Sequence, residues 1–444
     1  MLGTAAESVT DRLGADKHRL ALTAGGAAPI FAVDGVSMSA ATKERGTPTV
    51  PCARENISRS PANQYSCATT SRPLQKRIVV SAAASGSAPS MIDAPSTTNA
   101  AVVETTLGLT ARILTFIDAP SAADFDTLAL DVHAYQYRHN PPYRRFVDQR
   151  DGAQPRSWAE IPAIPALAFK ETALACAPAE RIYESSGTTE GPARRALHHV
   201  PDVVLYRTAA LAGFHRAVLP VGERRPFLVA APESASHPAS SLGEMVSWLR
   251  EAHDSGATTS FLADGGLDLA GLAHALDELD PARPVVLVAV TAALLRLADH
   301  ARNGRRRWQL PAGSLVIDTG GCKGYATNVP RAEILARYAE VIGVLPEQVV
   351  NEYGMTEMCS QLYATGLAPL QAPPWVRTLV CDPETGRVQP AGRAGLLRHF
   401  DLANLGSVMA VQTEDIGREV GGGIDLLGRA AHAEPRGCSL LLAG

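Results

Sequence analysis

Short apolar runs alternate with amphipathic segments over most of the chain, and this alternation limits the possible folds more than any other feature. The runs "RPFLVAAP", "RPVVLVAV" and "GSLVIDTGG" are bounded by proline or glycine and predict buried strands. Among them lie "SLGEMVSWLREAH", "LAGLAHALDEL" and "RAEILARYAEVIG", whose apolar residues recur at helical spacing. Strands that alternate with helices in this way predict an α/β fold with a parallel or mixed sheet.

The two ends of the chain differ from this α/β region. Residues 1–104 contain Ala/Ser/Thr-rich stretches without sustained periodicity, so we expect a disordered low-complexity extension, with Met91 as an alternative start. Residues 105–411 are expected to form the main domain. Residues 412–444 are expected to form a short hairpin, turning at Gly421–Gly423, and a tail.

Composition argues against several functional classes. Charged residues make up 19% of the chain and the formal net charge is −4, which gives no electrostatic footprint for nucleic acid. The seven cysteines are scattered without a Cys-x-x-Cys pair, which indicates reduced thiols in the cytoplasm rather than a zinc site. His198 and His199 are adjacent and face different sides of any regular element, so no metal pair is expected there. The longest apolar run, "PVVLVAVTAALL", is too short to span a bilayer and predicts a strand that continues into a helix.

A run of small and hydroxyl residues, "YESSGTTEGPARR", stands between a helix-like segment and a strand-like one. Such clusters are most often simple turns or linkers. Glycines also let a backbone approach an anion closely while N–H and hydroxyl groups donate to phosphate oxygens. A Walker P-loop is excluded, because Gly191 follows Gly187 too early and no Lys-Ser/Thr pair comes next. The loop alone is therefore compatible with phosphate binding and with a plain linker.

Three further segments carry candidate binding residues. The segment "IDTGGCKG" (317–324) predicts a strand that ends in a glycine turn, which is the geometry of a ligand crevice at the carboxyl edge of a sheet. The segment "NEYGMTEMCSQ" (351–361) places an aromatic residue, a glycine, a hydroxyl and a carboxylate close together. The segment "TEDIG" (413–417) precedes the expected hairpin, which ends in "LGRA". Each segment taken singly could also be structural, as a turn, a core aromatic or a turn-capping aspartate.

Taken in order, "ESSGTTEGP", "NEYGMTEM" and "TEDIG…GRA" resemble the adenylate-forming (AMP-forming acyl synthetase) superfamily. The closer resemblance is to its LuxE-type acyl-protein synthetase branch, carried over roughly residues 105–444 by "AIPALAFKE", "SSLGEMVSWL", "VIDTGGCKG", "NEYGMTEMCSQ" and "EPRGCSLLL". This resemblance implies the large domain of an adenylate-forming enzyme with a truncated C-terminal hairpin and tail. It also implies activation of a fatty or other hydrophobic carboxylate with ATP and Mg²⁺, and delivery of the acyl group to a partner acyl reductase.

The resemblance implies a nucleotide site assembled from the first two motifs. Backbone and hydroxyl donors of the glycine-rich loop would cradle the β- and γ-phosphates of ATP; these residues are Ser185, Ser186, Gly187, Thr188, Thr189 and Gly191. Tyr353 would pack on the adenine face, and Gly354 would leave room for the acyl chain or the base. Thr356 would donate to the α-phosphate, and Glu357 would hold Mg²⁺, a hard cation that prefers carboxylate and phosphate oxygens.

The third motif and the cations complete the implied site. Asp415 would accept hydrogen bonds from the ribose hydroxyls, with Arg429 close by. Where the family loop carries Gly-x-Pro-Lys, this chain has alanine and arginine after the proline, so Arg194 or Arg195 would face the phosphates. The chain stops soon after Arg429, without the domain that carries a catalytic lysine in typical members. Lys323 or Lys170 is expected to replace that lysine, although either could also be an ordinary solvated side chain.

The tail carries the implied acyl acceptor. The resemblance implies that Cys438 takes the acyl group from acyl-AMP as a thioester, with Arg436 favouring the thiolate, and the alternative is a buried, inert thiol. Cys322 and Cys359 could line the site, but packing is the expected role of both. Two other functions stay open from the sequence: a standalone AMP-forming acyl-CoA ligase and a degenerate adenylate-binding subunit.

Overall fold

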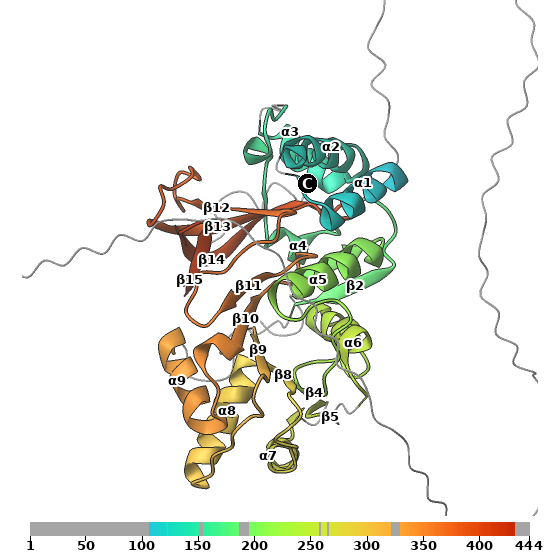
Figure 1. The fold of residues 1–444 in the computed structure, drawn as a ribbon. Coiled ribbons are helices and arrows are strands. Elements are labelled where there is room, and N and C mark those ends of the chain that lie inside the picture. Colours follow the sequence, from blue (N-terminus) through green and yellow to red (C-terminus); the bar gives the residue numbers. More distant parts are fainter. Residues whose placement is uncertain are drawn as a thin grey trace, which may run out of the picture. The chain divides into compact units, whose positions relative to one another are not determined.

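The structure is a computed structural model. It describes residues 106–121, 123–150, 154–185, 195–256, 259–263, 266–320 and 329–430. Within these ranges the chain is the mixed α/β protein that the sequence predicts (Figure 1). The expected extension over residues 1–104 and the tail beyond residue 430 lie outside the described residues. None of the helices in the described ranges is long and apolar enough to cross a lipid bilayer.

The larger of the two main sheets has six strands in the order β11-β10-β9-β8-β4-β5. These strands are β4 (Phe227–Ala230), β5 (Thr259–Ser260), β8 (Val286–Val290), β9 (Leu315–Thr319), β10 (Val349–Tyr353) and β11 (Leu362–Thr365). All neighbouring pairs are parallel except β10 and β11, which pair antiparallel. The three apolar runs predicted as strands are β4, β8 and β9, so these predictions are confirmed.

Helices cover both faces of this sheet, and the side chains of each strand alternate between two separate cores. In β8, Val286 and Val288 join a core shared with α5 (Val203–Ala217) and α6 (Ser241–His253). Leu287 and Ala289 join the other core, which contains residues of α7 (Leu269–Asp277), α8 (Thr291–Asn303) and α9 (Arg331–Ile342). Burial on both faces explains why these strands are continuous apolar runs. The predicted helices over α6, α7 and α9 are confirmed, as is the strand that continues into a helix at β8–α8.

The second main sheet runs in the order β1-β14-β13-β12, with β15 paired to β14. Its strands are β1 (Ile164–Pro165), β12 (Val376–Cys381), β13 (Ala394–Asp401), β14 (Ala410–Val420) and β15 (Gly423–Arg429). The hairpin β14–β15 turns at Gly421 and Gly422, as predicted, and both residues have the positive φ that a two-residue hairpin turn requires. Since β14 starts at Ala410, it crosses the boundary predicted between residues 411 and 412, and the division into domains stays a prediction.

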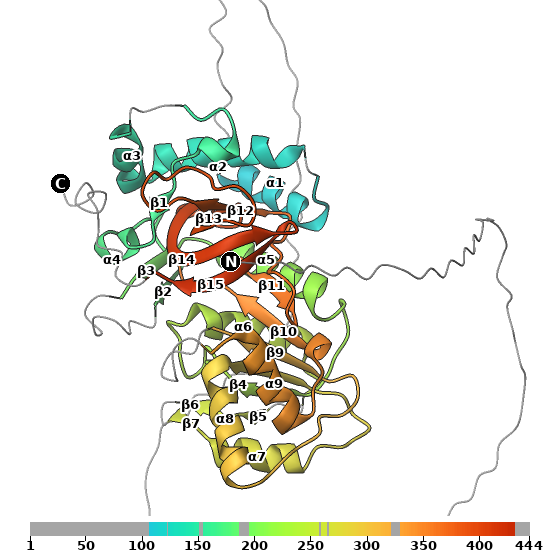
Figure 2. The same cartoon turned by 90° about the vertical axis from the view of Figure 1, so that its left-hand side faces the viewer.

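The N-terminal helices pack against this second sheet (Figure 2). They are α1 (Thr106–Asp118), α2 (Asp124–His139), α3 (Pro141–Asp148) and α4 (Ala168–Glu171), together with the short 3-10 helix η1 (Trp158–Glu160). A second short 3-10 helix, η3 (Pro346–Gln348), directly precedes β10 of the six-stranded sheet. The guanidinium of Arg377 on β12 lies 4.4 Å from the ring centroid of Phe125 on α2. Gln136 on α2 is 1% exposed, and its side-chain amide donates to the backbone oxygens of Asn404 and Leu405. The first helices are thereby fastened to the loop that precedes β14.

Two short hairpins complete the described elements: β2 (Arg181–Glu184) with β3 (Leu197–Val200), and β6 (Leu262–Ala263) with β7 (Gly266–Leu267). The first hairpin corrects an expectation. The glycine-rich loop connects two antiparallel strands, so the helix-like segment predicted before it is wrong. The residues of β2 alternate across the strand, with Tyr183 fully buried and Ile182 47% exposed, and pairing with β3 satisfies their backbone groups. A strand of four residues is too short for its alternating pattern to be recognised in the sequence.

Candidate active site

The carboxyl ends of β9 and β10 lie side by side because these two strands run parallel. β9 ends at Thr319 and turns through Gly320, whose φ of +68° is in the left-handed region that favours glycine. β10 ends at Tyr353 and continues into Gly354, which is exposed. In open α/β sheets the ligand crevice lies at this edge. The predicted motif after β10 therefore stands at the edge where a ligand is expected.

Three residues predicted for the nucleotide site come together from distant parts of the chain. The hydroxyl of Tyr353 donates to Asp415 Oδ2 at 2.8 Å. Arg429 Nε lies 3.9 Å from Asp415 Oδ1, and the two residues are paired across β14 and β15. The Tyr353 hydroxyl also lies 3.3 Å from His399 Nε2. Burial raises the pKa of Tyr353 well above its ordinary value, and the carboxylate of Asp415 raises it further, so the phenol remains a donor.

The loop after Tyr353 carries the residues predicted to contact the α-phosphate and Mg²⁺. Thr356 is half-buried, and Glu357 is 8% exposed. Behind them, the Asp401 carboxylate accepts from the Cys359 N–H at 2.9 Å and from the Ser360 hydroxyl at 2.7 Å. Burial raises the pKa of Asp401 to about 6, with these hydrogen bonds acting against the rise. The loop is thus anchored from below by a carboxylate of β13.

His198 and Asn404 contact the same loop, although no sequence motif singles them out. His198 Nδ1 lies 2.7 Å from the backbone oxygen of Thr356, and its Nε2 lies 3.0 Å from Asn404 Oδ1. The side-chain amide of Asn404 donates to the backbone oxygen of Glu357 at 2.9 Å. The sequence gives no local sign of these contacts, because His198 is 158 residues from Thr356 and 206 residues from Asn404. Only a method that detects buried polar residues far apart in the sequence could have found them.

Glu352 occupies the position just before Tyr353 and is 5% exposed. The Thr319 hydroxyl at the end of β9 donates to its carboxylate. Burial raises the pKa of Glu352 to about 7; the Thr319 hydrogen bond opposes this rise and the charge of Asp318 adds to it. A Cβ on Gly354 would lie 2.7 Å from Glu352 Oε1. Gly354 therefore makes room for this carboxyl group, and its predicted role toward the acyl chain or base stays a prediction.

The glycine-rich loop starts and ends at a hydrogen-bonded pair. Ser185 N–H donates to the backbone oxygen of Ala196 at 3.0 Å, and Ala196 N–H donates to Ser185 Oγ at 2.9 Å. Arg195 forms an ion pair with Glu184 at 2.8 Å, so its guanidinium is engaged at the mouth of the hairpin. The remaining predicted loop residues lie outside the described ranges; they are Ser186, Gly187, Thr188, Thr189, Gly191 and Arg194.

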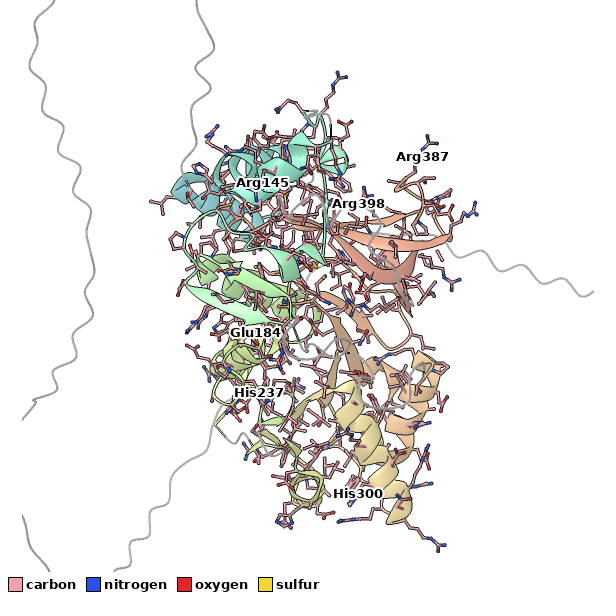
Figure 3. The ribbon with its side chains drawn as sticks, turned by 180° about the vertical axis from the view of Figure 1, so that it is seen from behind. Arg145, Glu184, His237, His300, Arg387 and Arg398 are labelled. Carbon is pink, nitrogen blue, oxygen red and sulfur yellow. The ribbon has the colours of Figure 1, made fainter. Side chains whose placement is uncertain are left out.

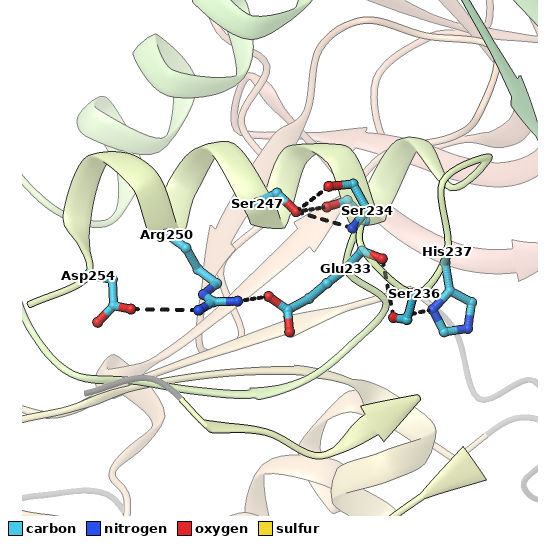
Figure 4. A network of polar contacts seen from close by, with 8 residues as sticks. Glu233, Ser234, Ser236, His237, Ser247, Arg250 and Asp254 are labelled. Atoms are coloured by element: carbon cyan, nitrogen blue, oxygen red, sulfur yellow. Dashed lines mark hydrogen bonds and ion pairs between the residues drawn. The ribbon is translucent and has the colours of Figure 1, made fainter. Parts of the chain in front are cut away.

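The segment after β4 lies beside this hairpin. Glu184 N–H of β2 donates to the backbone oxygen of Ala239 in the segment after β4, at 2.8 Å. Figure 3 labels Glu184 and His237, which belongs to the segment after β4. A polar network holds the segment on α6 (Figure 4). In it Glu233 forms an ion pair with Arg250, and the hydroxyls of Ser234 and Ser247 are 2.8 Å apart. The hairpin that carries the glycine-rich loop is thus supported from the six-stranded sheet.

The candidate cations and thiols divide between described and undescribed residues. Lys323, Cys322, Arg436 and Cys438 lie outside the described ranges. Lys170 is half-buried on α4, where its neighbour Phe169 packs edge-on against the His198 ring at 5.7 Å.

The described cysteines are packed thiols. Cys359 is 2% exposed, and burial raises its pKa well above the ordinary value, so the packing role expected for Cys359 is confirmed. Burial also raises the pKa of Cys176 to about 12 and raises that of Cys381. None of these three described thiols is primed as a thiolate nucleophile.

The described residues offer few ligands for Mg²⁺. Among the described residues no cluster of three or more His, Cys, Asp or Glu side chains could enclose a metal ion. Mg²⁺ in nucleotide sites needs only one or two protein carboxylates, because phosphates and waters fill its other positions. A single carboxylate on the loop after β10, such as Glu357, fits this mode of binding.

Comparison with known proteins gives a family and a fold. A family model described as "Acyl-protein synthetase, LuxE" matches residues 99–444. The chain is similar to an open conformation of 2-hydroxyisobutyryl-CoA ligase in complex with 2-HIB-AMP and CoA, at 20% identity and a TM-score of 0.51, covering 70% of this chain and 71% of that one. For the postadenylation state of the same ligase with 2-HIB-AMP, the identity is 20%, the TM-score 0.52 and the coverage 71% and 70%. ATP-bound MatB from Rhodopseudomonas palustris matches at 18% identity and a TM-score of 0.41, over 56% of this chain and 47% of that one. A comparison with curated proteins found no match.

Proposed function

We propose a function from one premise: the chain belongs to the LuxE family of acyl-protein synthetases. Its fold is that of the large domain of adenylate-forming enzymes. Membership supports an AMP-forming acyl ligase that uses ATP. The specific reaction we propose is the activation of a fatty or other hydrophobic carboxylate to acyl-AMP, followed by acyl transfer to a thiol of the enzyme.

One observation carries the proposal: Tyr353, Asp415 and Arg429 meet at the loop that contains Thr356 and Glu357. We infer that the adenosine binds at the first three residues. Tyr353 packs on the adenine, and Asp415 accepts from the ribose hydroxyls in place of the phenol that it now holds. The nucleotide then extends along the loop toward Thr356, which donates to the α-phosphate.

The adenylation step requires alignment and charge neutralisation more than acid–base chemistry. An oxygen of the substrate carboxylate attacks the α-phosphorus in line, the new C(O)O–P bond forms, and the bond to the β-phosphate oxygen breaks, releasing pyrophosphate. Ser185 and the loop that follows it hold the β- and γ-phosphates. Mg²⁺, when bound by Glu357, supplies positive charge to the phosphate oxygens. Lys323 or Lys170 supplies a further cation to the phosphate oxygens.

The second step transfers the acyl group to Cys438. Its thiolate attacks the acyl carbonyl of acyl-AMP, the thioester forms, and AMP leaves. The burial of Cys176, Cys359 and Cys381 supports this choice, because those thiols are poor thiolate formers. The thioester would deliver the acyl group to a partner acyl reductase, and we place the reaction in the cytoplasm.

ATP–pyrophosphate exchange across a panel of carboxylic acids tests the proposal. We expect exchange that depends on a hydrophobic carboxylic acid. If ATP binds but no acid supports exchange, the protein is a degenerate adenylate-binding subunit instead. CoA-dependent release of AMP by the Cys438→Ala variant would identify a standalone acyl-CoA ligase.

A further inference from the structure

We propose that His198 and Asn404 form a clamp that fixes the backbone of Thr356 and Glu357 in the orientation that adenylation requires. The clamp is a positioning device, and it rests on the adenylation function proposed above. Its two residues come from different elements: His198 lies on β3, and Asn404 lies in the loop between β13 and β14.

His198 connects the clamp to the glycine-rich loop. It is the third residue after Arg195, at which the described chain resumes, and its side chain is fully buried. Nδ1 is 2.7 Å from the Thr356 oxygen, which can only accept, and Nε2 is 3.0 Å from Asn404 Oδ1. Burial lowers the pKa of His198 to about 4, so the ring is neutral and donates through one nitrogen; the shorter contact assigns that proton to Nδ1. The edge-on ring of Phe169 fixes the plane of the imidazole from the side of α4.

Asn404 is held so firmly that its amide has one orientation. It is 2% exposed, and its Nδ2 donates to the backbone oxygens of Glu357, at 2.9 Å, and Val408, at 2.8 Å. Since both of these oxygens can only accept, Nδ2 must point toward them and Oδ1 toward His198. Gln136 in turn donates to the backbone oxygen of Asn404 at 2.9 Å.

The clamp therefore holds two successive backbone oxygens, those of Thr356 and Glu357, on the buried side of the loop. The direction of a peptide plane sets where the neighbouring side chains project, because the peptide is rigid. Turning either peptide would break a buried hydrogen bond and leave a polar group without a partner, which costs about 1–3 kcal/mol. The side chains predicted to face the α-phosphate and Mg²⁺ are thus held in one arrangement relative to β3.

Two amide substitutions separate the contacts of His198. The side-chain nitrogen of asparagine can take the place of Nδ1, so His198→Asn keeps a donor near Thr356 and loses the contact of Nε2 with Asn404. The side-chain nitrogen of glutamine can take the place of Nε2, so His198→Gln keeps a group beside Asn404 and loses the donor to Thr356. His199→Gln is the matched control, since His199 is the next residue of the same strand and projects to the opposite face.

Steady-state ATP–pyrophosphate exchange measures the catalytic effect. We expect His198→Gln to lower kcat at least about tenfold, as loss of one buried hydrogen bond to the reacting loop implies, with a smaller change in the KM for ATP. His198→Asn should recover most of the lost kcat, and His199→Gln should match the wild type. Equal kcat values for His198→Gln and His199→Gln would overturn the clamp.

Hydrogen–deuterium exchange of the peptide 354–361 gives a readout that does not need activity. We expect faster exchange in this peptide for His198→Gln than for His199→Gln, because the loop loses its tie to β3. Unchanged exchange would contradict the clamp even if activity fell. If the wild type shows no pyrophosphate exchange with any acid, the proposed function is wrong. The hydrogen–deuterium exchange measurement still shows whether His198 holds the loop. If His198→Gln does not fold, Asn404→Asp, which removes the donors to Glu357 and Val408, serves in both assays with the same expected directions.

Discussion

Glu352 is a carboxylic acid buried where β10 ends, and its protonation should be visible in stability. Its pKa of about 7 in the folded protein exceeds the ordinary value of 4.5, mainly because of burial. Between these two pH values the folded chain retains a proton that the unfolded chain has lost. The contribution of Glu352 to the free energy of unfolding is therefore fully present below about pH 4.5 and is lost as the pH rises through 7.

The Glu352→Gln variant should isolate this effect, because glutamine does not titrate. We expect its stability relative to the wild type to increase between pH 5 and pH 8, by up to about 3 kcal/mol. Urea unfolding at the two pH values checks this expectation. Glu347→Gln, an exposed substitution on η3, provides the control and should show no such trend. A stability difference that does not vary with pH would mean that Glu352 is not buried as a protonated acid.

Glu357 is the residue on which the predicted Mg²⁺ site depends. Glu357→Gln keeps the size of the side chain and removes its charge, so we expect pyrophosphate exchange to fall at least about a hundredfold, as when a group that stabilises transition-state charge is lost. The circular dichroism spectrum should remain that of the wild type. Glu347→Gln should keep full exchange activity. Near-normal exchange in a folded Glu357→Gln protein would remove this residue from the metal site.

At the residue scale, the sequence was informative where a motif is local. Tyr353 and Asp415 could be chosen from short motifs, and the structure brings these two side chains into contact. His198 could not be chosen, because its partners lie 158 and 206 residues away and neighbouring residues carry no sign of them. Most of the glycine-rich loop lies outside the described residues, and its role stays a prediction.

At the scale of elements, burial decided which strands could be predicted. β4, β8 and β9 are buried on both faces and are therefore recognisable as apolar runs. β13 was not predicted, because "LRHF" places charged and ionisable residues inside the strand. These polar side chains find partners across the sheet: Arg398 donates to Gln412 at 2.9 Å, and His399 lies 2.9 Å from the Thr378 hydroxyl. These hydrogen bonds make polar residues acceptable inside the strand, but they depend on neighbouring strands and leave no pattern in the local sequence.

The hairpin β14–β15 depends on the backbone conformation of its turn. Gly422 has a φ of +80°, where a Cβ would meet no other atom but the backbone itself is strained for L-residues. We expect Gly422→Val to destabilise the protein by about 1–2 kcal/mol. Gly422→Asn should cost less, because asparagine tolerates left-handed conformations. Urea unfolding of the two variants checks the order, and equal stabilities would show that the turn adapts without strain.

At the scale of the whole molecule, acyl-AMP formation and acyl transfer should be separable. The residues proposed to act in adenylation lie between Lys170 and Arg429, whereas Cys438 follows them in the sequence. Cys438→Ser should retain pyrophosphate exchange but should not retain label from a radioactive fatty acid after denaturation, because serine is a far weaker nucleophile at neutral pH. Label on the wild type should be released by neutral hydroxylamine, as expected for a thioester.

The matched control for this experiment is Cys176→Ser, which changes a thiol with a pKa of about 12 and should leave labelling intact. Undiminished labelling of Cys438→Ser would move the acyl site to another thiol. Cys322 would then become the leading candidate, since Cys359 is buried and its pKa is strongly raised.

The bonds between Gln136 and the loop before β14 have a consequence for the order of events during biosynthesis. The Gln136 side chain accepts from the N–H of Met409, which is 273 residues further along the chain. At about 5–20 residues per second, a ribosome needs on the order of 10–60 seconds to make that distance. During this interval α2 has been made, but the backbone groups that later form hydrogen bonds with the Gln136 side chain have not. The proposed clamp on Thr356 and Glu357 can close only after that wait, because Asn404 is made shortly before Met409. By then β1, β12 and β13 of the second sheet have been translated, whereas β14 and β15 have not.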